Sequence, residues 1–110
     1  MGERSWFYVY ALMNIKHNIY VGYTHDLEHR VNAHNQNVGA VATTKAKGPW
    51  FLFYAESYRS DHDARKRELE IIRTFENGVF LKKTYNSRAL VLREHGLEHK
   101  DWTAKIINQS

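Results

Sequence analysis

Two short runs of aromatic and β-branched residues near the N-terminus constrain the fold of this chain more than any other feature of its sequence. They occupy residues 6–12 (WFYVYAL) and residues 19–23 (IYVGY), and the turn-rich segment 14–18 (NIKHN) lies between them. Such runs favour β-strands, and a short polar connection favours an antiparallel hairpin. Because the first run is apolar on both alternating faces, it suits a strand that is buried on both sides.

Two tyrosines of this hairpin are expected to lie side by side. A pairing of Leu12 with Asn18 is the simplest register. It places Tyr10 opposite Tyr20, and opposed residues of an antiparallel pair point to the same face. Strand tyrosines are usually core residues with a hydrogen-bonded hydroxyl, so that structural interpretation stays open beside a functional one. Gly22, on the same face, has no side chain, which would let a ligand or phosphate approach the sheet closely.

The rest of the chain adds one strand and two helices before a short C-terminal piece. Residues 50–58 form a third β-type run, and a helix is predicted over about residues 25–35. Ser60 or Asp61 opens a second helix, and Gly78 ends this helix or the turn that follows it. The sequence has no internal repeat and no linker, so we expect a single folding unit.

Charge and composition narrow the classes of function. The 110 residues include 16 Lys and Arg against 12 Asp and Glu, and the net charge of +4 fits a polyanionic partner without specifying one. The absence of cysteine excludes disulfides, thiolate nucleophiles and thiolate zinc sites. The longest apolar run, residues 50–55, is far shorter than the roughly 20 residues of a membrane-spanning helix. The first residues lack a signal-peptide pattern, so we expect a cytoplasmic protein.

The first predicted helix carries a basic pair on its inward side. Arg30 and His34 share one helical face with the apolar residues Leu27 and Val31. A guanidinium can chelate phosphate oxygens, and an imidazole can exchange a proton near neutral pH. Taken alone, however, the pair fits better with an arginine that extends to solvent and a surface or hydrogen-bonded histidine.

Glu68 falls inside the apolar stripe of the second predicted helix, where an unpaired carboxylate is unfavourable. Two kinds of partner can compensate it. One is an arginine, for which Arg30, Arg65 and Arg67 are available. The other is Mg²⁺, which is often held by one carboxylate together with water and substrate phosphate.

Other polar clusters are less specific. His25 and His29 have the spacing of a zinc-binding pair, but the sequence shows no third ligand. The cationic loop 43–48 (TTKAKG) suits phosphate contact or simple solvation. The basic segments 65–67 and 82–83 are typical of solvated surfaces.

Taken together and in order, these residues resemble the GIY-YIG nuclease superfamily, and in particular its small stand-alone bacterial branch. The first signature corresponds to residues 8–12 (YVYAL) and the second to residues 20–24 (YVGYT). Arg30 and His34 follow at the expected intervals, and a helical Arg-Glu pair at residues 67–68 completes the series. The spacing makes this resemblance specific, whereas a lone Tyr-Val-Gly would carry little information.

The resemblance covers residues 6 to about 83 and implies an α+β fold, a three-stranded antiparallel sheet flanked by helices. We expect a nuclease domain over residues 1–85. Residues 86–110 are expected to form a C-terminal helical extension that packs on or near the same domain. That extension could cover the sheet or mediate pairing, so we expect a monomer or a weak homodimer.

The resemblance also implies a set of site residues. Its catalytic residues would be Tyr10, Tyr20, Arg30, His34 and Glu68, with Glu68 also the metal ligand. We expect the nucleic-acid-binding residues to be Tyr8, Gly22, Thr44, Lys45, Lys47 and Arg67. A C-terminal asparagine that several superfamily members use has no clear counterpart; Asn77 and Asn86 are candidates.

The implied activity is that of a DNA endonuclease dependent on Mg²⁺ or Mn²⁺, selective for structure or strand state rather than sequence, with a role such as DNA repair. Glu68 would anchor the metal and Arg30 would hold the scissile phosphate. Tyr10 or Tyr20, its pKa lowered by the metal and nearby cations, would position or deprotonate the attacking water, and His34 would help that proton leave.

Two other hypotheses come from different functional classes. The chain could be a non-catalytic nucleic-acid-binding module on the same scaffold, which predicts salt-dependent binding without metal dependence. Its C-terminal extension could instead make it a dimeric accessory factor.

Overall fold

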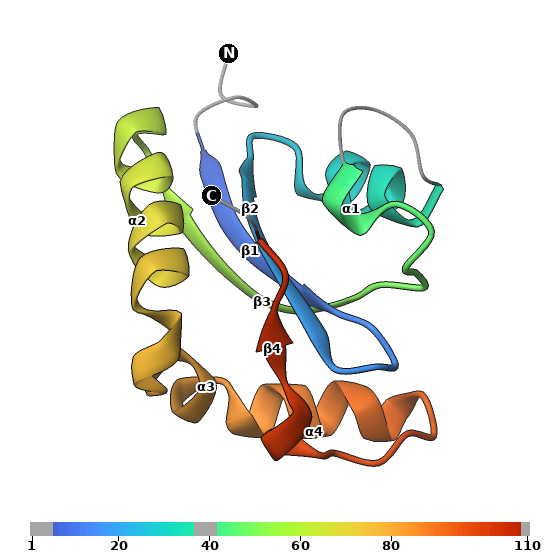
Figure 1. The fold of residues 1–110 in the computed structure, drawn as a ribbon. Coiled ribbons are helices and arrows are strands. Elements are labelled where there is room, and N and C mark those ends of the chain that lie inside the picture. Colours follow the sequence, from blue (N-terminus) through green and yellow to red (C-terminus); the bar gives the residue numbers. More distant parts are fainter. Residues whose placement is uncertain (1–5, 37–41, 109–110) are drawn as a thin grey trace.

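The protein folds around one four-stranded sheet that helices cover on both faces (Figure 1). The computed structural model describes residues 6–36 and 42–108. The strands are β1 (Phe7–Met13), β2 (Asn18–Thr24), β3 (Phe51–Tyr58) and β4 (Lys105–Ile106), in the spatial order β3-β1-β2-β4. β1 pairs antiparallel with β2 and β3, whereas β4 runs parallel to β2. The α+β prediction is confirmed, but the expected three-stranded antiparallel sheet gains a fourth, parallel strand from the C-terminal segment.

The helices follow the predicted order. They are α1 (Leu27–Gln36), α2 (Asp61–Thr74), α3 (Val79–Lys83) and α4 (Tyr85–Glu94), with 3₁₀ turns η2 (Ala42–Thr44), η3 (Phe75–Asn77) and η4 (Asp101–Thr103). Ser60 caps α2, because its side chain accepts a hydrogen bond from the backbone N–H of Asp63 at 3.2 Å. Gly78 has a positive φ of 80° and closes η3, as its position predicted.

The hairpin register differs from the prediction by two residues. Tyr10 pairs with Gly22, and Tyr20 pairs with Leu12. The turn is centred one residue later than expected, where the side chain of Asn14 accepts hydrogen bonds from the backbone N–H groups of Lys16 and Asn18, at 3.0 and 2.9 Å. A shift of two residues preserves the alternation of side chains, so both tyrosines still point to the same face.

Each face of the sheet has its own core. Val9 and Ala11 of β1 point to the face that α2, α3 and α4 cover. Tyr10 and Leu12 point to the opposite face, where they pack with Trp50 and with apolar residues of α1. β1 is therefore buried on both sides, as its apolar composition predicted.

The C-terminal segment is built into the domain. Arg88 of α4 is fully buried and forms an ion pair with Asp101 of η4. Beyond β4, the side chain of Asn108 hydrogen-bonds both the N–H and the carbonyl of Val21, each at 2.7 Å. Asn108 is thereby fixed along β2.

Candidate active site

A chain of hydrogen bonds joins β1, α1 and η2 on the α1 face of the sheet. The Tyr10 hydroxyl lies 2.7 Å from Nε2 of His34, and Nδ1 of the same imidazole lies 2.8 Å from the Thr44 hydroxyl. The Tyr20 ring packs against His34 with 4.9 Å between centroids, and the two tyrosine rings are 6.4 Å apart. Three residues predicted for one site thus lie in direct contact, and we call Tyr10, Tyr20, His34 and Thr44 the tyrosine–histidine cluster.

His34 is neutral at physiological pH. Burial and the nearby Arg30 guanidinium lower the pKa of its imidazole to about 4. A neutral imidazole has one donor and one acceptor nitrogen, and the hydroxyls of Tyr10 and Thr44 satisfy both. The ring is therefore held in one orientation while remaining able to take up a proton.

Thr44 orients His34 and does not present its side chain to a ligand. The residue has no exposed surface, and its carbonyl accepts a hydrogen bond from the indole Nε1 of Trp50 at 3.1 Å. The expectation that Thr44 contacts nucleic acid is corrected accordingly. A threonine in a cationic loop reads as a surface residue, and only the tertiary structure shows that its loop folds over α1.

Gly22 is required by Tyr10. A Cβ atom at this position would lie 2.6 Å from the Tyr10 hydroxyl oxygen, so the phenol occupies the space that the missing side chain leaves. The predicted close approach of a ligand to Gly22 is therefore replaced by the approach of Tyr10. The glycine allows the phenol to lie across β2 and reach His34.

Both phenols are protonated in the metal-free protein. Burial is the main cause that raises the pKa of Tyr10, and the neighbouring Tyr20 adds to it, while Arg30 acts in the opposite direction. Burial and the charge of Glu68 likewise raise the pKa of Tyr20. Without the metal, loss of solvent outweighs the effect of the Arg30 guanidinium, so the expected lowering of a phenol pKa depends on the bound cation.

Glu68 is a half-buried carboxylate close enough to act electrostatically on both phenols. Within residues 6–36 and 42–108, no cation lies within ion-pair distance of it. Arg65 hydrogen-bonds the Tyr23 hydroxyl at 2.7 Å, and Arg67 is engaged elsewhere. Burial raises the pKa of the Glu68 carboxyl, and the nearby charge of Arg65 acts in the opposite direction. Among the described residues, no arginine therefore forms an ion pair with Glu68, and Arg65 acts on its carboxylate only at longer range.

The donor set around Glu68 suits a hard cation. It offers one carboxylate with phenolic oxygens nearby, and Mg²⁺ commonly takes one or two carboxylates and completes its octahedron with water and phosphate. No cluster of three His, Asp or Glu side chains occurs in the described part of the chain. A single-carboxylate site is thus the form of cation site that these residues fit.

Comparison with known proteins bears on this arrangement directly. Residues 6–86 match the family model of the GIY-YIG catalytic domain. The chain belongs to the GIY-YIG family. A UPF0213 protein of Clostridium perfringens is 37% identical over 100 residues, which cover 90% of this chain and 96% of that protein. A UPF0213 protein of Pediococcus pentosaceus is 35% identical over 91 residues, covering 83% and 85% of the two chains.

The relatives also support the assignment of this GIY-YIG chain to the small bacterial branch. A UPF0213 protein of Staphylococcus haemolyticus is 39% identical over 75 residues, which cover 68% of this chain and 89% of the relative. No solved structure matches the chain. None of the helices in the described ranges has the length and apolar character that a membrane crossing requires.

The remaining predicted residues of the GIY-YIG domain are spread around this cluster. Tyr8 lies on β1 on the same face as Tyr10 and is half-buried. Lys45 and Lys47 are exposed, and Nζ of Lys47 donates to the Thr43 carbonyl at 3.2 Å. Both lysines are positioned in the loop that also carries Thr44 of the tyrosine–histidine cluster.

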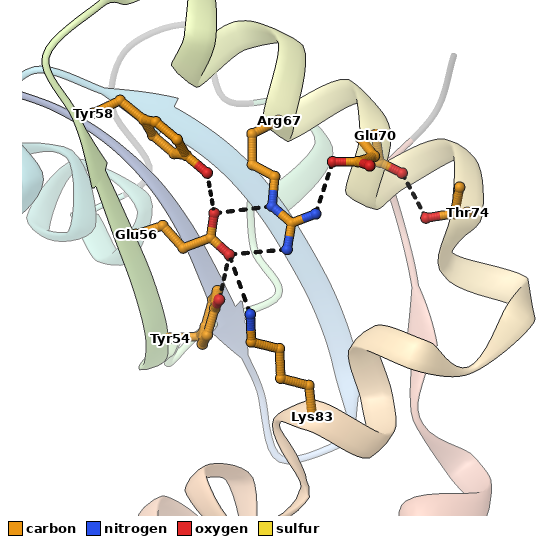
Figure 2. Close-up of polar contacts among 7 residues, drawn as sticks. All are labelled: Tyr54, Glu56, Tyr58, Arg67, Glu70, Thr74 and Lys83. Atoms are coloured by element: carbon orange, nitrogen blue, oxygen red, sulfur yellow. Dashed lines mark hydrogen bonds and ion pairs between the residues drawn. The ribbon is translucent and has the colours of Figure 1, made fainter.

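Arg67 is not available as predicted for nucleic-acid binding. Its guanidinium is bound by two carboxylates, those of Glu56 and Glu70, at 2.9 and 2.8 Å (Figure 2). A side chain held in this way has few donors left for a phosphate. The sequence shows an arginine beside Glu68, but the partner on β3 is apparent only in the fold.

The candidate asparagines lie outside the tyrosine–histidine cluster, and one other asparagine takes part in shaping it. Asn77 accepts a hydrogen bond from the Val79 N–H at 2.9 Å, and Asn86 is exposed on α4. The sequence assigns Asn35 no role, yet its amide bonds the N–H and carbonyl of Trp50 at 2.6 and 3.1 Å and so ties the loop to α1. Its place directly after His34 was the available signal.

Proposed function

We propose that this GIY-YIG domain is a divalent-metal-dependent endonuclease that hydrolyses phosphodiester bonds in DNA. The observation that carries this proposal is the proximity of Glu68, a half-buried carboxylate with no ion-pair partner in the described chain, to the hydrogen-bonded Tyr10–His34 pair. A carboxylate left in this state beside proton-transfer groups is unfavourable for stability alone, and such groups gather at functional sites.

Glu68 would hold the cation, Mg²⁺ or Mn²⁺. When bound, the cation supplies positive charge that offsets the charge developing on the phosphate and on the leaving oxygen. Arg30 would bind the nonbridging phosphate oxygens through its planar guanidinium. Its electrostatic influence on Tyr10, Tyr20 and His34 supports this role, because it places the guanidinium at the same site.

The proton of the attacking water would leave through the tyrosine–histidine cluster. Tyr20 or Tyr10 would orient the water through its hydroxyl oxygen. Because Tyr10 stays a phenol and His34 stays neutral, Tyr10 can receive a proton and pass its own to Nε2 of His34 in one concerted shift. Thr44 would keep the imidazole aligned during that transfer.

DNA is the partner that the surface supports best. The net charge of +4 and the exposed Lys45 and Lys47 next to the cluster provide sequence-independent contact with phosphates. Such contact favours selection by strand state or structure rather than by sequence, and it suits a role in DNA processing such as repair. We assign the nuclease domain to residues 1–85 and treat 86–110 as an extension that packs on it.

A cleavage panel tests this function. Purified protein is incubated with end-labelled single-stranded, nicked, branched and duplex DNA in Mg²⁺, Mn²⁺ or EDTA. We expect cleavage only with a divalent cation, at least about a hundredfold less product from Glu68→Ala, and near wild-type product from the exposed-residue control Glu70→Ala. Equal product from wild type and Glu68→Ala would reject the proposal.

The raised phenol pKa values favour one alternative function, a nucleic-acid-binding module without turnover. That function predicts binding to DNA that weakens steeply with salt but is unaffected by EDTA. Fluorescence anisotropy on the same substrates separates the two functions. Metal-independent binding without any cleavage would favour the module.

A further inference from the structure

An ionic cluster on the α2 face of the sheet links α2 to β3 (Figure 2). Glu56 of β3 lies at its centre. Its carboxylate oxygens accept hydrogen bonds from Nε and Nη2 of Arg67 at 2.9 and 3.0 Å, and from the hydroxyls of Tyr58, at 2.6 Å, and Tyr54. Nζ of Lys83 lies 3.8 Å from the same carboxylate. We call these residues the Glu56 cluster.

The carboxylate of Glu56 is strongly held in its ionised form. Burial favours the neutral carboxyl, but the hydrogen bonds from Arg67, Tyr54 and Tyr58 outweigh burial and lower the pKa of Glu56 to about 2. The contact with Arg67 is bidentate, and this planar geometry restricts rotation of the arginine as well as its distance.

Arg67 and Glu68 lie on opposite sides of the ridge by which α2 packs on the sheet. Ala64 and Ile71 form that buried ridge. Successive helical residues are about 100° apart, so Arg67 flanks the ridge on one side and Glu68 on the other. Any rotation of α2 about its axis therefore moves both side chains together.

The apolar contact of this ridge with the sheet resists such a rotation only weakly. At a helix radius of about 5–6 Å, a rotation of about 10° moves a side-chain position by about 1 Å. A misplacement of about 1 Å at a catalytic centre can lower the rate by about a hundredfold. The rotational setting of α2 thus matters far more for Glu68 than for the stability of the core.

We propose that the bidentate contact between Glu56 and Arg67 is the device that positions Glu68 opposite the tyrosine–histidine cluster. Glu56 and Arg67 act as positioning residues, because neither reaches the reacting atoms. This role rests on the proposed function of Glu68. It also explains why an arginine next to Glu68 in the chain is tied to β3 and does not neutralise Glu68.

The second ion pair of Arg67 provides a matched control. Glu70 lies three residues further along α2 and binds Nη1 of Arg67 at 2.8 Å, so this pair lies wholly within the helix and cannot fix α2 against the sheet. Glu56→Gln removes the charge of the contact between helix and sheet and preserves side-chain size. Glu70→Gln removes one ion pair from the same guanidinium and leaves that contact intact.

The test measures single-turnover cleavage against Mg²⁺ concentration, together with urea unfolding. We expect Glu56→Gln and Arg67→Lys each to lower the maximal rate by about 10–100-fold and to raise the Mg²⁺ concentration for half-maximal rate. Urea unfolding checks that both variants are folded under the assay conditions. Glu70→Gln should stay within about twofold of wild type. The double variant should lose no more than the worse single variant, because both changes break one contact.

Several results would overturn the proposal. A folded Glu56→Gln protein with wild-type rate and Mg²⁺ dependence would do so, as would an equal loss in Glu70→Gln. If Glu56→Gln does not fold, Arg67→Lys carries the same test. If the wild type cleaves nothing, the proposed function fails, and crystal structures of Arg67→Lys and Glu56→Gln then test the positioning role separately. A shift of Glu68 by about 1 Å relative to Tyr10 in either variant supports that role. An unmoved Glu68 refutes it.

Discussion

The two faces of the sheet treat their charged side chains in opposite ways. On the α2 face, Glu56 and Arg67 bind each other and further partners, so that their charges are matched. Towards the α1 face, Glu68 and Arg30 form no ion pair with any described residue, although they influence the same tyrosines. On the proposals above, the matched charges fix α2 against β3, whereas the unmatched charges of Glu68 and Arg30 would bind a cation and a phosphate.

Of the substitutions discussed below, we expect the largest loss of cleavage from a change to Arg30, which like Glu68 forms no ion pair with any described residue. Arg30→Lys keeps the charge but loses the planar guanidinium, and we expect cleavage to fall by about 100–1,000-fold. Arg65→Lys serves as the control, since it keeps the charge that acts on Glu68 and alters only the exposed contact with Tyr23. Single-turnover rates decide the matter, and a rate for Arg30→Lys within twofold of the wild type would remove Arg30 from the site.

A second substitution tests the tyrosine–histidine cluster. His34→Ala removes the imidazole that bonds the buried hydroxyls of Tyr10 and Thr44, so we expect about a hundredfold slower cleavage and about 1–3 kcal/mol less stability in urea unfolding. His29→Ala on the exposed side of α1 should change neither by much. Unchanged activity in folded His34→Ala would show that protons leave by another route.

Gly22→Ala tests whether the position of Tyr10 in the tyrosine–histidine cluster depends on this glycine. The new methyl group would lie 2.6 Å from the phenol oxygen, so the ring must shift away from His34. We expect a loss of about 1–3 kcal/mol in stability and a parallel loss of cleavage. A crystal structure of the variant with an unmoved Tyr10 hydroxyl would contradict this explanation of the glycine.

The smallest expected effect concerns acid stability on the matched side. The folded-state pKa of Glu56, about 2, lies below the usual value of 4.5, so its stabilisation is complete above that value and is lost as pH falls towards 2. Between about pH 5 and 2, the free energy of unfolding of Glu56→Gln should therefore fall by about 1–2 kcal/mol less than that of the wild type.

His34 contributes a separate decline that begins at higher pH. Its folded pKa of about 4 is below the ordinary 6.5, so the corresponding stability is lost as pH falls from about 6.5 to 4. Urea titrations of Glu56→Gln at pH 7, 5 and 3 isolate the lower window. A decline as steep as that of the wild type between pH 5 and 3 would mean that Glu56 is not the group responsible.

Much of the fold followed from local sequence, because strand alternation and helix caps are local properties. The shared face of Tyr10 and Tyr20 was predictable even though the register was wrong by two residues, since side-chain parity survives that shift. β4 was not predictable. A strand of two residues has no pattern of its own, and both of its residues, Lys105 and Ile106, pair with a strand far earlier in the chain.

The candidate site was predictable to the extent that its residues occur at characteristic intervals. Spacing identified Tyr10, His34 and Glu68, but it gave no information on what each side chain touches. Thr44 and Arg67 were assigned to ligand binding because both are polar and near the motifs, whereas the fold buries one and pairs the other with Glu56. Contacts across strands and loops decide such roles, and they depend on the tertiary structure.

The most direct test of the central claim, that Glu68 is kept without an arginine partner in order to hold a cation, is Mn²⁺ binding followed by electron paramagnetic resonance. Wild type and Glu70→Gln are compared with Glu68→Gln, in parallel with cleavage assays in the same buffer. We predict that Glu68→Gln loses both saturable Mn²⁺ binding and cleavage, while Glu70→Gln retains both. Undiminished Mn²⁺ binding and cleavage in Glu68→Gln would contradict the account.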